Sequence, residues 1–279
     1  MQRDSIQNTF RVAILLCLVC SVLVSAMAVG LRPIQQRQKQ EFKQKSILKA
    51  AGLWTDEDES DSAADVSEFY NRFITPVIVD LETNTSSERF EPTDPDLDAE
   101  RAARSNELSD ALPAGMDPAG IRRREKYSIV YEVRDNGELR TLVIPIRGYG
   151  LWSTLWGFIA LDVQNAVGDP SKISVVGITY YKHGETPGLG GEVENPLWRE
   201  KWVGKKIYDP NWNVEIEVAK GASGDYQVDA LSGATLTSNG VSNMLSFWFG
   251  PEGFGPYLKN LLGTAQAGIG SSAEQSPAH

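Results

Sequence analysis

The most prominent hydrophobic pattern in the chain lies close to its amino terminus. From Val12 to Leu31, 20 consecutive residues include no charged side chain. At about 1.5 Å per residue, a helix of this length spans roughly 30 Å, the thickness of the hydrocarbon core of a bilayer. A cleaved signal peptide has a shorter apolar core of about 7–15 residues. The pattern therefore predicts an uncleaved transmembrane helix over residues 12–31, preceded by a tail over residues 1–11.

The segments that follow the span are more polar. Residues 32–65 predict a juxtamembrane helix that ends near Gly52 and continues into an acidic, exposed linker. Residues 84–124 are polar and punctuated by prolines, which predicts a surface excursion with partial helix. The last residues, 264–279, contain few bulky apolar side chains and are predicted to form a disordered tail.

The remaining chain predicts a single α+β domain over residues 66–263. Two β-rich runs flank Asn136-Gly137, a strong signal for a β-hairpin. Further strands are predicted at 75–83, 157–163, 173–181 and 213–220, and helices at 66–73, 195–204, 237–249 and 255–262. The predicted fold is one N-terminal transmembrane helix followed by a mixed, largely antiparallel sheet domain with flanking helices.

Charge is distributed unevenly along the chain. The first 50 residues hold eight basic and two acidic side chains, whereas the rest hold 19 basic and 35 acidic ones. A part this acidic is a poor binder of phosphate backbones, so we expect no nucleic-acid partner. Most basic residues near the span lie on its carboxyl side, and by themselves they weakly favour a cytoplasmic location for the domain.

Cysteine and histidine offer little chemistry. Cys17 and Cys20 both fall within the apolar span, where thiols are typical small apolar residues. His183 is the only histidine apart from the last residue, and one histidine among carboxylates is weak evidence for a metal site. We therefore expect no metal and no Ser-His-Asp type of nucleophilic catalysis.

The segment Asp229 to Gly240, "DALSGATLTSNG", combines an acid, small residues and the start of a helix. The apolar residues Val241, Met244, Leu245 and Trp248 follow at helical spacing. Thr237 or Ser238 is the expected cap, which places Thr235 just before a helix amino terminus, where anions are favoured. On the residues alone, a simple turn and cap is the preferred interpretation, and a hydroxyl beside a bound phosphate is the alternative.

Two further segments are rich in glycine. "HGETPGLGGEVE", residues 183–194, follows a predicted strand and allows close approach to a ligand, although it matches neither a Walker loop nor G-x-G-x-x-G. "GYGLWSTLWGFIALD", residues 148–162, alternates glycines with aromatics. These aromatics either belong to the core or stack on a flat heterocycle.

Together with "GPEGFGPYLKNLL" near the carboxyl end, these segments resemble the C-subunit family of the sodium-translocating NADH:quinone oxidoreductases, which has a covalent FMN-binding domain. The resemblance implies that Thr235 receives FMN through a phosphoester bond formed by a separate flavin transferase. Asp229 matches the acid of the family motif. The other implied flavin-site residues are Ser232, Gly233, Ala234, Trp152, Glu185, Thr186, Gly188 and Leu189.

The resemblance also implies a role. The chain would be a one-electron carrier in a membrane complex that moves electrons from NADH to ubiquinone coupled to Na+ export, and it would not be catalytically competent alone. The A, B, D, E and F subunits of the quinone reductase complex and membrane lipid are the implied partners. The domain would be periplasmic on the bacterial inner membrane, against the charge count. Alternatives are the G subunit of the homologous Rnf electron-transport complex and a membrane-tethered flavin-binding or sensory module without a redox partner.

Overall fold

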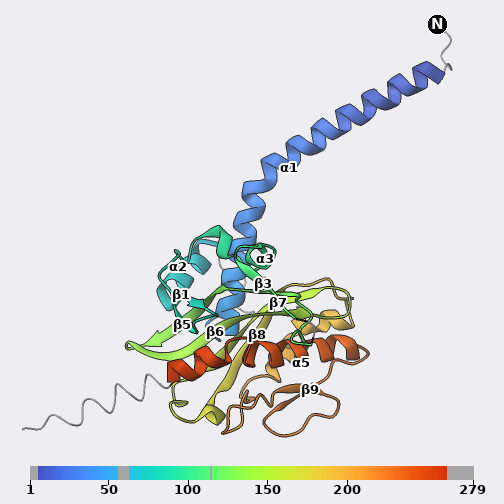
Figure 1. The fold of residues 1–279 in the computed structure, drawn as a ribbon. Coiled ribbons are helices and arrows are strands. Elements are labelled where there is room, and N and C mark those ends of the chain that lie inside the picture. Colours follow the sequence, from blue (N-terminus) through green and yellow to red (C-terminus); the bar gives the residue numbers. More distant parts are fainter. Residues whose placement is uncertain (1–5, 56–62, 114, 263–279) are drawn as a thin grey trace, which may run out of the picture. The chain divides into compact units, whose positions relative to one another are not determined.

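The computed structural model describes residues 6–55, 63–113 and 115–262 (Figure 1). The predicted acidic linker largely coincides with residues 56–62, which lie outside the described residues, as does the predicted tail over 264–279. The chain divides into two units, residues 1–43 and 44–279. The sheet domain therefore begins at Gln44, well before the predicted residue 66, because the last turns of the first helix belong to its core.

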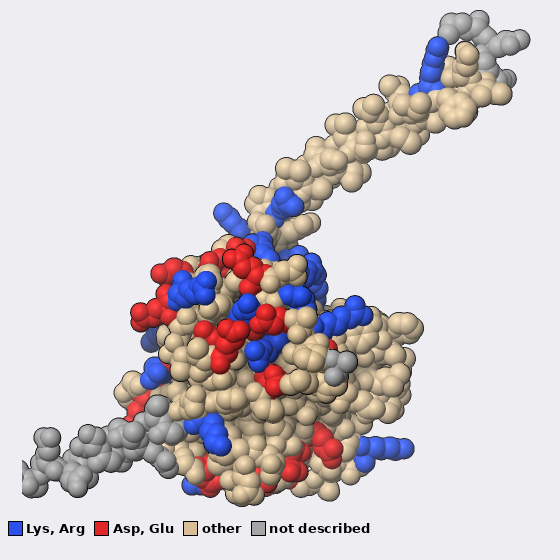
Figure 2. Space-filling model, viewed as in Figure 1, with Lys and Arg blue, Asp and Glu red and all other residues tan. Residues whose placement is uncertain are grey.

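The first unit consists of helix α1, which runs without interruption over Ile6–Ala50 and ends in the second unit. The helix is long and apolar enough to cross a membrane. Its outer surface is free of charged side chains over a long stretch bounded by basic ones (Figure 2). These features indicate membrane anchoring. The predicted span of residues 12–31 and the predicted juxtamembrane helix are parts of one continuous helix.

A six-stranded sheet, in the order β2-β1-β5-β6-β7-β8, organises the second unit. All its pairs are antiparallel. Its strands are β1 (Ile74–Asp80), β2 (Thr85–Ser86), β5 (Tyr127–Asp135), β6 (Glu138–Tyr149), β7 (Thr154–Asp162) and β8 (Ser174–Lys182). The predicted hairpin joins β5 to β6, and Asn136 and Gly137 both have positive φ, 51° and 87°, as a type I′ turn requires. The fold class is confirmed.

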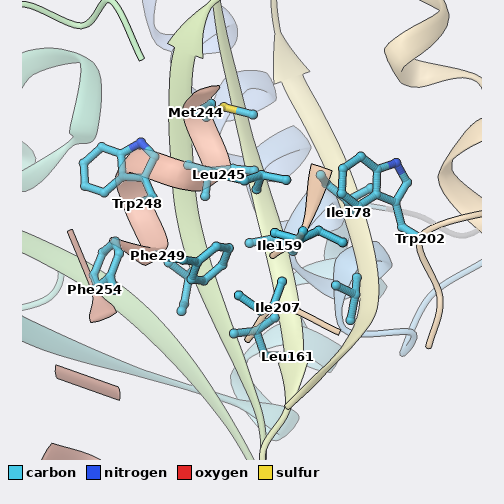
Figure 3. Packing of buried hydrophobic residues seen from close by; sticks show 14 of the residues in the cluster. Ile159, Leu161, Ile178, Trp202, Ile207, Met244, Leu245, Trp248, Phe249 and Phe254 are labelled. Atoms are coloured by element: carbon cyan, nitrogen blue, oxygen red, sulfur yellow. The ribbon is translucent and has the colours of Figure 1, made fainter. Parts of the chain in front are cut away.

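Alternating side chains give the sheet two buried faces. On one face, Leu142, Ile144, Ile159 and Leu161 join the cluster formed with helix α5 (Thr235–Phe249). Figure 3 shows Met244, Leu245, Trp248 and Phe249 of α5 beside Ile159 and Ile178. On the other face, Val143, Phe158 and Ala160 contact Ile47, Leu48 and Ala50 at the end of α1. The period of two in the sequence thus becomes a sheet covered by helices on both sides.

The smaller elements connect these layers. They are α2 (Ala63–Phe73), the 3₁₀ helix η2 (Pro95–Leu97), α3 (Ala99–Ala102), β3 (Ser109–Ala111), β4 (Arg123–Glu125), η3 (Pro170–Lys172), η4 (Gly190–Glu194), α4 (Pro196–Glu200), β9 (Glu217–Ala219) and β10 (Gln227–Asp229). A last helix covers 255–262.

Two local predictions need correction. The predicted excursion over residues 84–124 is not wholly a surface segment, because it contributes β2 to the main sheet and buries Leu97 and Ala102. The strand predicted over 213–220 is reduced to β9, which pairs in parallel with β10 in a separate two-stranded sheet. Because β10 is only three residues long, it limits the length of the β9–β10 ladder.

Candidate functional site

Three segments that are far apart in the sequence meet at the amino end of α5. We call them the aromatic turn (residues 149–153, between β6 and β7), the glycine-rich loop (183–191, after β8) and the threonine motif (229–237, from the end of β10 into the first turn of α5). Glu185 of the glycine-rich loop accepts hydrogen bonds from the backbone of the aromatic turn and from Thr237, in the first turn of α5. The structure thus brings the three predicted segments together.

The threonine motif ends in a helix start without a side-chain cap. Thr235 is the first residue of α5, Ala234 is the cap residue, and no side chain of the described residues caps the helix there. Gly233 has a φ of 72°, which favours glycine, and an added Cβ would lie 3.1 Å from Leu189 Cδ2. The backbone therefore turns sharply against the glycine-rich loop and leaves the first N–H groups of α5 available to an acceptor.

The prediction that Thr237 or Ser238 caps the helix is wrong. Both side chains are buried, and both hydroxyls are used elsewhere. Thr237 Oγ1 donates to Glu185 Oε2 at 2.7 Å, and Ser238 Oγ accepts from Leu231 N at 3.0 Å. Thr235, by contrast, is exposed, and its hydroxyl makes no hydrogen bond within the described part of the chain.

Asp229 holds the beginning of the motif in place. Its carboxylate accepts hydrogen bonds from Lys201 Nζ at 3.1 Å and Ala222 N at 3.2 Å, and its carbonyl accepts from Trp198 Nε1 at 2.8 Å. The hydrogen bond from Lys201 lowers the pKa of Asp229. The acid of the motif thus ties β10 to the region of α4, and Ser232 remains exposed on the turn that follows.

Glu185 is the most connected side chain of the site. It is 5% exposed, and its Oε1 accepts from Leu151 N, Trp152 N and Ser153 N at 3.0–3.2 Å. Burial raises the pKa of Glu185, but the hydrogen bonds from Thr237 and the aromatic turn outweigh it, so the pKa lies below its usual range. The carboxylate is an anion held by donors from two other segments.

Two glycines make room for this carboxylate. A Cβ on Gly150 would lie 2.7 Å from Glu185 Oε1, and one on Gly190 would lie 2.7 Å from Oε2 and 2.5 Å from Thr237 Oγ1. Any larger residue at either position would displace the carboxylate or the helix. The close approach of the three segments therefore depends on glycine at these two positions.

The remaining predicted residues are exposed around the amino end of α5, and we call the surface that they form the exposed rim. Trp152 is 66% exposed and Leu189 is 45% exposed, and Leu236 on the first turn of α5 is 59% exposed. Thr186 and Gly188 are exposed as well, and the Thr186 carbonyl accepts from Leu189 N and Gly191 N. Of the aromatics in the glycine-aromatic segment, Trp156 is buried, which confirms core packing for this side chain, whereas Trp152 is exposed and its stacking on a heterocycle stays a prediction.

His183 supports the glycine-rich loop. Its Nδ1 accepts from Glu185 N at 3.1 Å, so the proton of the neutral ring is on Nε2, which lies 3.0 Å from Glu194 Oε1. The two ring nitrogens are thus engaged with groups of the chain.

A groove lies elsewhere on the sheet domain. It measures about 520 Å³ and is lined by residues 214–217 and 223–227 with Ser242, Asn243 and Ser246 of α5. Neither Thr235 nor the glycine-rich loop borders it. Because the chemistry of the motifs converges at the amino end of α5, we take the exposed rim there, rather than the groove, as the candidate site.

Sequence reasoning missed Ser153, and it gave Thr237 a capping role and Gly150 and Gly190 the role of making room for a ligand rather than for Glu185. Ser153 Oγ accepts from Gly184 N at 2.6 Å and joins the aromatic turn to the glycine-rich loop. One signal for Thr237 was available, since it falls four residues before Val241 on the apolar face of α5. A hydroxyl on a buried face needs a partner.

Comparisons with known proteins agree with this arrangement. A family model described as an FMN-binding domain matches residues 150–249, which include all three segments except Tyr149. The C subunit of the Na(+)-translocating NADH-quinone reductase from Pseudomonas aeruginosa is 46% identical over 93% of this chain and 97% of its own length. The Yersinia pestis protein of the same name is 45% identical over 92% of this chain and 94% of its own.

Solved structures agree on the fold. The crystal structure of Shewanella oneidensis NqrC matches with a TM-score of 0.69 and 30% identity, over 82% of this chain and 98% of that one. The C subunit of the Na(+)-translocating NADH-quinone reductase from Parabacteroides distasonis, at 24% identity and a TM-score of 0.59, shares the fold. The chain therefore belongs to the family of Na(+)-translocating NADH-quinone reductase C subunits.

Proposed function

We propose that the chain holds FMN covalently, through a phosphoester to Thr235, and serves as a one-electron carrier of a Na+-translocating NADH:quinone reductase. The observation that supports this most strongly is the exposed Thr235 hydroxyl on the first residue of an uncapped 15-residue helix. The site lies within the part of the chain that matches the FMN-binding domain.

In this proposal, the amino terminus of α5 holds the phosphate of FMN. The first N–H groups of α5 and the helix dipole favour an anion, and Ala234 has no side-chain acceptor that would occupy them. Gly233, in its left-handed conformation, keeps the preceding backbone close without a Cβ. A phosphate esterified to Thr235 Oγ1 is thus held next to the donors that stabilise it.

The flavin ring would lie against the exposed rim. Trp152 and Leu189 present apolar surface that the chain itself leaves uncovered, and Leu236 adjoins Thr235 in sequence. Aromatic and aliphatic side chains of this kind pack against a flat heterocycle, and aromatic pairs contribute about 0.5–1.5 kcal/mol beyond burial. When bound, FMN would supply a ring that accepts and releases electrons one at a time.

Attachment is a phosphoryl transfer. Thr235 Oγ1 would form a bond to the phosphorus of an FMN phosphate that is activated as a phosphoanhydride. The anhydride bond would break, its other phosphate group would leave with the bridging oxygen, and the hydroxyl proton would pass to a base. A separate flavin transferase provides the activated donor and the base. Thr235 is accessible to such an enzyme because it is exposed, and Ser232 and Gly233 beside it are exposed as well.

The names of the relatives and the membrane anchor support the role of carrier. Eight curated relatives are C subunits of Na(+)-translocating NADH-quinone reductases, which favours this assignment over the Rnf G subunit and over an isolated flavin module. In this role the chain depends on the A, B, D, E and F subunits and does not oxidise NADH alone.

We place the sheet domain on the periplasmic side of the inner membrane. The basic residues after the span argue weakly against this, but long domains translocate largely regardless of charge. The basic flank is then free to contact lipid headgroups or partner subunits. Digestion of the domain by protease added to intact spheroplasts supports the periplasmic side, and digestion only after lysis contradicts it.

Thr235→Val tests the attachment. Protein co-produced with the transferase is denatured, separated by gel electrophoresis and inspected for flavin fluorescence. We expect a fluorescent band for the wild type and none for Thr235→Val. Thr93→Val, which changes an exposed threonine outside the site, is the matched control and keeps the label. Flavin fluorescence that persists in Thr235→Val refutes the assignment.

A further inference from the structure

The carboxylate of Glu185 lies at the junction of the three site segments, where it is buried and fully occupied. Its Oε1 accepts from Trp152 N at 3.0 Å, Ser153 N at 3.1 Å and Leu151 N at 3.2 Å. Its Oε2 accepts from Thr237 Oγ1 at 2.7 Å and shares Leu151 N at 3.2 Å. A carboxylate has about four lone-pair sites, so these donors leave no capacity for a bound ligand.

These contacts change the role of Glu185. The resemblance places it in a loop that contacts the flavin, but its oxygen atoms face the aromatic turn and α5, and the side chain is 5% exposed. The groups that the carboxylate joins indicate a different role. One of its donors belongs to the backbone of Trp152, and another belongs to Thr237, two residues after Thr235 in the same helical turn.

We propose that Glu185 is a positioning residue of the flavin site, which sets the spacing between the attachment helix and the aromatic turn. The inference rests on the proposed function, in which Thr235 holds the phosphate and Trp152 lies beside the ring. Glu185 acts on both ends through other groups. It fixes the first turn of α5 through Thr237 and the aromatic turn through three consecutive N–H groups, a nest of donors that suits an anion.

The anion is required, not merely a polar side chain of the same shape. A glutamine that points its oxygen at the three N–H groups presents its NH2 group to Thr237 and to Leu151 N. The Thr237 hydroxyl can rotate to accept from that NH2, but the Leu151 N–H then faces another donor. Gly150 and Gly190 leave no space for the side chain to shift away, since each lies against the carboxylate.

The charge has a second consequence. A buried negative charge is poorly screened, and flavin reduction adds negative charge nearby. Loss of the Glu185 charge therefore raises the midpoint potential of the flavin. A residue that only stabilises the fold would change the melting temperature without this shift. The potential therefore shows whether the charge acts on the flavin, and exchange of the 151–153 amides shows whether Glu185 positions the aromatic turn.

The test uses the full-length chain in detergent with Glu185→Gln, and Glu200→Gln as the matched control. Glu200, at the end of α4, is exposed. Hydrogen exchange is measured on protein produced without the transferase, and flavin loading and midpoint potential on protein produced with it. We expect Glu185→Gln to speed exchange of the 151–153 amides by about tenfold or more, because these amides lose charge-assisted hydrogen bonds. We also expect its midpoint potential to rise, and the control to show neither change.

The outcomes distinguish the two proposals. Wild-type exchange at 151–153 in Glu185→Gln overturns the positioning role, whatever the potential of that variant. If the wild type itself carries no flavin, the proposed function fails, whereas the exchange data still decide whether Glu185 holds the aromatic turn. Should Glu185→Gln not fold, Thr237→Val removes only the link to α5. We expect wild-type exchange at 151–153 but a shifted potential in that variant, and an unshifted potential contradicts the inference.

Discussion

Substitution of Gly240 tests how closely α5 must approach the aromatic turn. Gly240 lies in the second turn of the helix, and a Cβ added there would lie 2.4 Å from Tyr149 O and 3.1 Å from Gly150 Cα. Both of these neighbours are backbone atoms. They cannot rotate away as the end of a flexible side chain would, so Gly240→Ala forces α5 and the aromatic turn apart.

Two effects of opposite sign determine the size of the change. Within a helix, alanine is favoured over glycine by about 0.8–1.0 kcal/mol. Overpacking a well-packed site typically costs about 1–3 kcal/mol, and a contact of 2.4 Å with backbone belongs at the upper end or beyond. We therefore expect Gly240→Ala to lower the free energy of unfolding by about 2 kcal/mol or more. For a domain of this size, about 2 kcal/mol lowers the melting temperature by about 4–8 °C.

The assay is thermal unfolding of the full-length protein in detergent, followed by tryptophan fluorescence. Asn239→Ala is the matched control, because Asn239 is exposed on the same helix and gains propensity without a clash. The control should melt at or slightly above the wild-type temperature. If Gly240→Ala is as stable as Asn239→Ala, the reasoning is refuted, because α5 then does not approach the aromatic turn as closely in solution as in the structure.

Three further predictions concern the stability of the sheet domain. Arg147→Ala leaves the carboxylate of Glu125 buried without its ion-pair partner and should cost about 3–5 kcal/mol in urea unfolding; a loss under 1 kcal/mol would contradict the burial of this pair. Leu48→Ala, at the fully buried end of α1, should cost about 2–5 kcal/mol, and no loss would mean that this end of α1 is not part of the core. The pKa of Glu185 is lowered in the folded state, so its carboxylate stabilises the fold. This contribution to the free energy of unfolding is fully present above the unfolded-state pKa and is lost as pH falls through the folded-state pKa. The stability difference between wild type and Glu185→Gln should therefore shrink with acid, measured by melting temperature from neutral to acidic pH, and a difference that is constant with pH would refute this.

The sequence predicts those elements whose pattern is repeated along one segment. The β-rich runs of β6 and β7 predict strands, and Asn136-Gly137 predicts the hairpin because few residues tolerate its two positive φ angles. Helix α5 follows from the spacing of its apolar side chains. The residues that cause each of these elements to form lie within one segment, so the sequence of that segment is enough to predict the element.

The elements that the sequence does not predict depend on distant partners. Thr237 is an attractive cap by sequence, but its hydroxyl donates to Glu185, 52 residues away. Glu185 in turn accepts from Trp152, 33 residues away, which no local pattern discloses. The short β9 depends on the length of β10, and the buried part of α1 depends on the sheet that covers it. Tertiary contacts decide each of these features.

The most direct test of the central claim is the intact mass of the full-length chain after co-production with a flavin transferase, followed by fragmentation to locate the adduct. We predict one FMN, joined as a phosphoester, on every chain and on Thr235 alone. An unmodified mass, or an adduct on any other residue, would contradict the claim.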